Sequence, residues 1–157
     1  MKIKLLVIGK TDDKNLSQLI ENYQNRLQHY ICFQLEIIPD IKNIKNLSQL
    51  QQKEKEGELI LSKLKNTDLL VVLDEKGKEF RSLDFASFLQ KKMNSGIKKL
   101  VFVIGGPYGF SETVYKKAMG KVALSKMTFS HQMIRLFVVE QLYRGFTILK
   151  NEPYHHE

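Results

Sequence analysis

The fold is decided by the stretch Leu100-Val101-Phe102-Val103-Ile104-Gly105-Gly106-Pro107-Tyr108-Gly109. Its first half is a continuous apolar run, which is typical of a strand buried on both faces of a parallel sheet. Its second half is a glycine-rich loop, in which glycine permits positive φ angles and lets a ligand approach the backbone closely. Ser111 follows and is predicted to cap a short helix over residues 112–119. The chain therefore passes from a buried strand through a loop into a helix.

The same alternation of strand and helix extends along the chain in both directions. Further strands are predicted at residues 2–8, 33–38, 69–73 and 122–124. Further helices are predicted at residues 13–29 and 47–65, and a third that Ser82 can cap and Gly96 ends. A last helix of about 17 residues is predicted to start near His131. Asn46 and Gln49 are predicted to cap the second helix reciprocally, and Lys76-Gly77-Lys78 to form a turn. Strands separated by helices imply an α/β fold, a single domain over residues 1–157 with a mostly parallel sheet flanked by helices.

Composition and charge limit the classes of protein to which the chain can belong. The 157 residues are 43% hydrophobic and 27% charged, as in ordinary soluble globular proteins. No segment approaches the roughly 18 consecutive apolar residues of a membrane helix, so no membrane partner is expected. The single cysteine, Cys32, excludes an internal disulfide, indicates a reducing, cytoplasmic location, and is interpreted as a small buried hydrophobe. Lys and Arg number 25 against 17 Asp and Glu, and the net charge of +8 favours an anionic partner such as nucleic acid.

The predicted sheet also indicates where a ligand binds. In parallel sheets, ligands bind beyond the carboxyl ends of the strands, which are here after Leu73, at residues 105–109 and after Leu124. The G-G-x-x-G order of the loop does not match the dinucleotide fingerprint G-x-G-x-x-G. Lys4 occupies the position at which a P-loop ending in Gly9-Lys10-Thr11 needs glycine. Two common nucleotide motifs are therefore excluded.

Candidate polar groups lie near the C-terminus. His131 stands where an irregular segment meets the last helix, either as a locally bonded helix-start residue or as a group that exchanges protons near neutral pH. Arg135 and Arg144 lie about 180° apart around that helix, so a single chain does not cluster them, whereas a dimer can build one site from two chains. His155 and His156 belong to a tail that by itself is typical of a solvated terminus. No paired Cys/His spacing is present, so no metal is expected.

Three stretches together carry a resemblance to a known family. They are Val101-Phe102-Val103-Ile104-Gly105-Gly106-Pro107-Tyr108-Gly109, Leu124-Ser125-Lys126-Met127-Thr128-Phe129-Ser130-His131-Gln132-Met133-Ile134-Arg135, and Glu140-Gln141-Leu142-Tyr143-Arg144 with Pro153-Tyr154-His155-His156-Glu157. On these residues the sequence resembles the RlmH family of bacterial 23S rRNA (pseudouridine-N3) methyltransferases, of the SPOUT class. The resemblance covers the whole chain. Ser130 stands where proline is common in relatives, a departure that affects local loop geometry.

The resemblance implies a fold, a cofactor and partners. The fold is SPOUT-type with a deep trefoil knot in the C-terminal half, which general folding rules do not suggest. The cofactor is S-adenosylmethionine (SAM), with no metal, and the partners are 23S rRNA within the 70S ribosome and a second copy of the chain. The residues that the resemblance assigns to SAM are Leu73, Gly105, Leu124, Ser125, Lys126, Met127, Thr128 and Phe129. They lie at the three strand ends that the sheet rule selects.

The catalytic hypothesis follows from the chemistry of the implied acceptor. N3 of pseudouridine carries a proton, so its lone pair becomes free to attack a methyl group only as that proton leaves. We expect His131 or a tail histidine such as His155 to act as the base. Arg135 or Arg144 is expected to supply positive charge and phosphate contacts. Tyr154 is expected to stack on an exposed base.

Three other functions are compatible with the same sequence. A SPOUT methyltransferase acting on another RNA, such as tRNA, has the same fold and differs only in substrate. A non-catalytic ribosome-binding module keeps the fold and lacks SAM binding. The third alternative is a flavodoxin-like nucleotide-binding domain. A protease-resistant, SAM-binding C-terminal half would argue against it. SAM binding therefore separates the methyltransferases from the other two classes.

Overall fold

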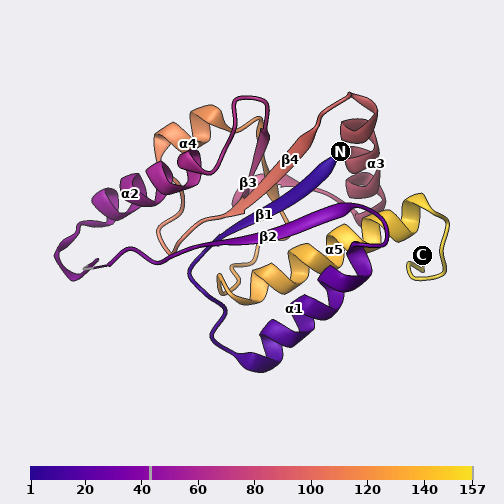
Figure 1. Ribbon diagram of the computed structural model, residues 1–157, viewed down its shortest axis with the longest axis horizontal. Helices are drawn as coiled ribbons and strands as arrows, with labels where there is room; N and C mark the ends of the chain where they lie inside the picture. Colours follow the sequence, from indigo (N-terminus) through magenta and orange to yellow (C-terminus); the bar gives the residue numbers. More distant parts are fainter. Residues whose placement is uncertain (43, 157) are drawn as a thin grey trace.

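The computed structural model describes residues 1–42 and 44–156 and has an α/β fold (Figure 1). In chain order the elements are β1 (Lys2–Ile8), α1 (Lys14–Leu27), β2 (Cys32–Ile38), the 3-10 turn η1 (Ile44–Asn46), α2 (Gln49–Ser62), β3 (Leu69–Glu79), α3 (Ser82–Asn94), β4 (Lys99–Ile104), α4 (Glu112–Lys117), β5 (Gly120–Ala123) and α5 (Met133–Leu149). The strands form one parallel sheet in the order β2-β1-β4-β3-β5. The predicted parallel α/β class is confirmed.

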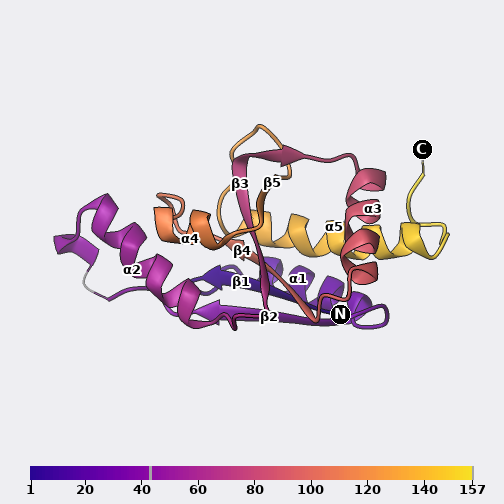
Figure 2. The same cartoon turned by 90° about the horizontal axis from the view of Figure 1, so that it is seen from above.

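Helices cover both faces of this sheet (Figures 1 and 2). Helices α1, α3 and α5 pack on one face, and α2 and α4 pack on the other. Successive side chains of the central strands alternate between the two cores: Leu5 and Phe102 face α1, α3 and α5, whereas Leu6 and Val103 face α2 and α4. Because both faces are buried, each central strand is a continuous apolar run, which is why the sequence predicts it.

The predicted turn at Lys76-Gly77-Lys78 lies inside β3, which is longer than predicted. Val122 of β5 pairs with both Leu73 and Lys78, so the residues between these two positions of β3 form a bulge. A Cβ atom at Gly77 would lie 2.7 Å from the backbone of Val122. Glycine at this position therefore allows the bulged strand to lie directly against β5.

The predicted helix caps are correct at α4 and wrong at α2. Ser111 accepts a hydrogen bond from a backbone N–H of α4, as predicted. Helix α2 is capped by Ser48, and the side chain of Gln51 accepts the backbone N–H of Ser48 in return. Asn46, the predicted cap, belongs to the preceding 3-10 turn, and Gln49 is the first residue of the helix. The sequence offers two overlapping capping signals here, and the helix uses the second.

Two other small residues differ from their predicted roles. Ser82 starts α3 without capping it, and its hydroxyl donates instead to Gln141 of α5 at 3.0 Å. Cys32 is exposed at the first position of β2, so its interpretation as a buried hydrophobe is wrong. Gly96 agrees with the prediction, because its φ of 75° follows the end of α3. Within the described residues, no helix has the length and apolar character needed to cross a membrane.

Candidate functional site

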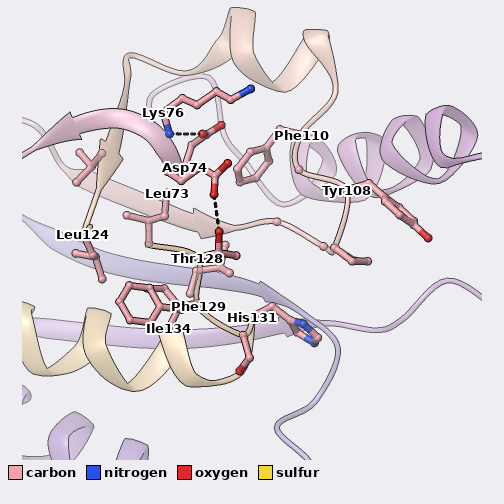
Figure 3. Close-up of a pocket in the computed structure, with 18 of the residues that line it drawn as sticks. Leu73, Asp74, Lys76, Tyr108, Phe110, Leu124, Thr128, Phe129, His131 and Ile134 are labelled. Atoms are coloured by element: carbon pink, nitrogen blue, oxygen red, sulfur yellow. Dashed lines mark hydrogen bonds between the residues drawn. The ribbon is translucent and has the colours of Figure 1, made fainter. Parts of the chain in front are cut away.

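A cavity of about 670 Å³ opens at the carboxyl ends of β3, β4 and β5 (Figure 3). Its volume lies within the range of small-molecule sites, about 300–1,000 Å³. Three segments form most of its wall: the β3 bulge, the glycine loop that follows Ile104, and the irregular segment that follows Ala123. This is the edge of the sheet at which parallel α/β folds bind ligands.

Seven of the eight residues that the resemblance assigns to SAM line this cavity. They are Leu73, Gly105, Leu124, Ser125, Met127, Thr128 and Phe129. The eighth, Lys126, turns its side chain to solvent, with 85% of it exposed and its ammonium 3.9 Å from the carboxylate of Glu79. Because its two chain neighbours both line the cavity, only the backbone of Lys126 is close to the site.

The glycine loop forms the β4 side of the cavity. The backbone N–H of Gly109 donates to the carbonyl of Gly106 at 3.2 Å, and the φ of 79° at Gly109 is a left-handed conformation that favours glycine. A Cβ at Gly105 would lie 3.1 Å from the ring of Phe110, which is buried. A tight turn and a buried aromatic anchor therefore hold the loop backbone beside the cavity.

Two acidic residues, Asp74 and Glu75, line the cavity from the β3 bulge. The carboxylate of Asp74 accepts a hydrogen bond from the backbone N–H of Lys76 at 2.8 Å (Figure 3) and another from the hydroxyl of Tyr115. Burial, with the hydrogen bond to Asp74, raises the pKa of Tyr115 to about 12, so the phenol stays protonated and donates at neutral pH. Asp74 and Glu75 are not among the site residues predicted from the sequence. The one signal for them in the sequence is that they directly follow a buried strand.

The irregular segment that follows β5 is held at three points. The hydroxyl of Thr128 donates to Oε2 of Glu75 at 3.0 Å, across the cavity (Figure 3). Oγ of Ser125 accepts a backbone N–H two residues further on at 3.0 Å. The ring of Phe129 packs 5.2 Å from that of Phe137 on α5. The segment therefore offers ordered backbone groups and apolar side chains to a bound molecule.

His131 lines the cavity, and Arg135 lies behind it in the interior. The side chain of Arg135 is 1% exposed and donates hydrogen bonds to four protein oxygens. These are the carbonyls of Ile8 at 2.6 Å, Gly9 at 3.0 Å and His131 at 3.1 Å, and the hydroxyl of Thr11 at 3.0 Å. Burial lowers the pKa of Arg135 from its ordinary value. The phosphate contact expected of Arg135 does not fit this position, and its guanidinium instead ties the start of α5 to the end of β1.

The other predicted catalytic residues, Arg144, Tyr154 and His155, gather around Glu140 in the middle of α5. Glu140, Arg144, Tyr154 and His155 form what we call the tail cluster. Oε1 of Glu140 accepts hydrogen bonds from Nη2 of Arg144 at 2.6 Å and from the hydroxyl of Tyr154 at 3.0 Å. Nη1 of Arg144 lies 3.3 Å from Nδ1 of His155. The hydrogen bond to Glu140 raises the pKa of Arg144, and burial raises that of Tyr154, so both remain protonated at neutral pH.

The tail cluster and the cavity lie apart within one chain. No member of the tail cluster lines the cavity. His131 precedes α5, whereas Glu140 and Arg144 lie in its middle and later part, and the chain that follows the helix brings Tyr154 and His155 back to them. At the usual rise of 1.5 Å per residue, Arg144, which contacts His155, lies about 15 Å along α5 from Ile134, which lines the cavity. One protomer therefore does not bring His131 and His155 to a common site.

A family profile described as "Predicted SPOUT methyltransferase" matches residues 1–155. The chain belongs to the SPOUT methyltransferase family. It is similar to the ribosomal RNA large subunit methyltransferase H of Flavobacterium johnsoniae, with 73% identity over all of both chains, and to that of Parabacteroides distasonis, with 66% identity over all of both chains. Its fold is similar to that of a probable methylase family protein from Haemophilus influenzae, with a TM-score of 0.52 and 13% identity over 99% of this chain and 70% of that one.

Because the chain belongs to this family, methyl transfer is the class of reaction for which the cavity is a candidate site. SPOUT methyltransferases transfer methyl groups, and the cavity lies at the segments that the resemblance assigns to the methyl donor. Among the described residues, no three His, Cys, Asp or Glu side chains are grouped so that they could hold a metal ion. Whether this SPOUT methyltransferase works without a metal stays a prediction.

Proposed function

We propose that this SPOUT methyltransferase moves a methyl group from SAM to N3 of a pseudouridine in 23S rRNA, acting on the assembled 70S ribosome in the cytoplasm. The main support is that seven of the eight expected SAM residues line the same cavity. The identity of 73%, over the full length, to a protein named as a large subunit rRNA methyltransferase supports the same substrate class.

The residues of the cavity suit SAM. SAM combines a planar adenine with a positively charged sulfonium and ammonium group. Apolar side chains such as Leu124 and Phe129 can enclose the faces of a planar ring, while backbone groups of the same segment bond its edge. The carboxylates of Asp74 and Glu75 line the same cavity and complement positive charge. When bound, SAM supplies a methyl group already activated by the sulfonium charge.

Residues of the chain itself must then orient the acceptor base and remove its proton. His131 lines the cavity, and we assign it the removal of the N3 proton, which frees the lone pair of N3. Arg135 holds the backbone carbonyl of His131 at 3.1 Å and therefore orients this residue without touching RNA. His155 is the second candidate for the base, because Nη1 of Arg144 lies 3.3 Å from its ring nitrogen.

A homodimer would bring the tail cluster to the cavity. Arg144 of the cluster lies about 15 Å along α5 from Ile134, which lines the cavity of its own chain, and no member of the cluster lines that cavity. We therefore infer that a second chain supplies the cluster. Phe129, Met133 and Phe137 leave exposed apolar surface at the cavity end of α5, which a second α5 can cover. In this arrangement Arg144 contacts phosphate and Tyr154 stacks on a base.

Methyl transfer from labelled SAM tests the proposal. The substrates are 70S ribosomes, isolated large subunits and naked rRNA from cells that lack the protein, with tRNA as a fourth substrate. Label on one pseudouridine of 70S particles, mapped by mass spectrometry, is the expected result. Label on tRNA alone would support the other-RNA alternative. SAM binding without label on any substrate would also contradict the rRNA assignment, and absence of SAM binding would favour a non-catalytic module.

A further inference from the structure

Glu56 of α2 has no part in the proposed function, and it is buried, with 4% of its surface exposed. Its Oε1 accepts a hydrogen bond from the side-chain amide of Gln52 at 2.9 Å. Its Oε2 has no hydrogen-bond partner among the described residues. A buried carboxyl with an unpaired oxygen is costly to the folded state, because the lost hydration is not replaced. The carboxyl lies beside the glycine loop that lines the cavity.

The carboxyl of Glu56 packs directly against the glycine loop. A Cβ at Gly106 would lie 2.6 Å from Oε1 and 2.8 Å from Cδ of Glu56, closer than real Cβ atoms approach. The next residue of α2 makes a similar contact at the other end of the loop. A Cβ at Gly57 would lie 3.2 Å from Cβ of Ser111 and would overlap its hydroxyl oxygen. Two successive residues of α2 therefore hold both ends of the segment from Gly106 to Ser111.

The loop lies between this support and the cavity. Gly105 and Gly106 line the cavity, whereas Glu56 and Gly57 do not. Helices α2 and α4 pack on the same face of the sheet, in a core that contains Ile60 of α2 and Phe110 of the loop. A shift of the Glu56 carboxyl would therefore move the backbone that a ligand in the cavity contacts.

We propose that Glu56 is a positioning residue for the methyl donor: its carboxyl sets the backbone of Gly105 and Gly106 from the side opposite the cavity. The proposal rests on the proposed SAM site and adds to it a residue outside the three segments that form most of the cavity wall. Glu56 acts through the shape and hydrogen bonding of its carboxyl, since it does not touch the cavity itself.

The surroundings of the Glu56 carboxyl influence its pKa in opposite directions. Burial raises the pKa of Glu56, and the hydrogen bond from Gln52, together with the nearby backbone of Gly106, opposes this. Asp40, at the end of β2, raises the pKa further, whereas His131 lowers it. Glutamine keeps the shape of the side chain and an oxygen that accepts from Gln52, so it is expected to replace the carboxyl.

SAM affinity of the full-length protein, measured by calorimetry, tests the role. Glu56→Ala is expected to weaken SAM binding about 10-fold, the equivalent of one lost positioning interaction, whereas Glu56→Gln restores affinity to within about threefold of wild type. Glu58→Gln is the matched control, because Glu58 lies on the same helix and is exposed. Amide hydrogen exchange is the second readout: in Glu56→Ala it should accelerate from Gly106 to Phe110 and stay unchanged in β1 and β4.

Three results would overturn the proposal. The first is Glu56→Ala binding SAM as tightly as wild type. The second is exchange that accelerates evenly along the chain in this variant, since that indicates general destabilisation. The third is Glu56→Gln losing as much affinity as Glu56→Ala. A wild-type protein that does not bind SAM would contradict the proposed function instead, and the exchange of the loop in Glu56→Ala would still decide whether Glu56 positions it.

Discussion

Gly77 shows how a single residue shapes the cavity wall. A Cβ there would lie 2.7 Å from the backbone of Lys121 and Val122, which has no freedom to rotate away. Gly77→Ala is expected to lower the free energy of unfolding by about 1–3 kcal/mol through overpacking. The same change should weaken SAM binding, because the bulge carries Asp74. Urea unfolding measures the first effect and calorimetry the second.

Gly120→Ala is the matched control for this change. Gly120 lies in β5, beside the bulge, and a Cβ there would meet no atom within 4 Å. Its φ is not in the left-handed region. The free energy of unfolding of Gly120→Ala should therefore stay within about 1 kcal/mol of the wild-type value. Equal stability of the two alanine variants would contradict the tight packing at Gly77.

The buried carboxyl of Glu56 predicts a pH dependence of stability. Burial raises its folded-state pKa above the ordinary value of 4.5. The contribution of such a group is full below the unfolded pKa and is lost as pH rises through the folded pKa. Glu56→Gln removes this loss, so the variant should gain stability relative to wild type as pH rises above about 4.5. Asp40 and His131, which also face the carboxyl, are present in both proteins.

Urea unfolding at a series of pH values from about 4 to 8 measures this difference. Glu58→Gln, an exposed change on the same helix, should show a much smaller trend. A Glu56→Gln difference that does not vary with pH would mean that the carboxyl titrates alike in the folded and unfolded chain.

At the scale of elements, Arg135 joins α5 to the end of β1. Its guanidinium satisfies the carbonyls of Ile8 and Gly9, and a buried carbonyl without a donor costs about 1–3 kcal/mol. Arg135→Met should therefore lower the free energy of unfolding by about 2 kcal/mol or more. Arg26→Met on α1 is the control: Arg26 is exposed and lies 5.6 Å from the ring of Tyr23, a contact worth about 1 kcal/mol or less. Similar losses in both variants would contradict the anchoring role.

At the scale of the whole molecule, the separation of cavity and tail predicts complementation between chains. His131→Ala and His155→Ala should each abolish methyl transfer if both side chains serve one site. Unfolding and refolding the two variants together should restore activity to about a quarter of the wild-type value, because half of the dimers are mixed and each holds one intact site.

Methylation of 70S particles by the mixture measures this recovery. Each variant alone is the control, and SAM binding by His155→Ala should be retained, since His155 does not line the cavity of its own chain. No recovery in a mixture that forms mixed dimers would mean that each site uses residues of one chain only. The trefoil knot that the resemblance implies stays a prediction alongside the dimer.

The sequence by itself determined the parallel α/β class and the edge of the sheet at which the cavity opens. The apolar runs that become β3 and β4 are buried on both faces, so their pattern is visible without coordinates. The resemblance added the residue identities, and seven of the eight proposed SAM residues line one cavity. These features depend on local pattern and on strand order, both of which the chain carries directly.

Only the tertiary structure decided the rest. The bulge of β3 depends on its pairing with β5, so the sequence shows neither the need for Gly77 nor the hydrogen bonds of Asp74 with Tyr115 and of Glu75 with Thr128. Arg135 is an ordinary arginine in sequence, and its burial follows from the meeting of α5 with the end of β1. Glu56 lies 50 positions from Gly106, and its contact with the loop exists because α2 and α4 pack on the same face. Contacts between distant segments are set by packing, which no local pattern records.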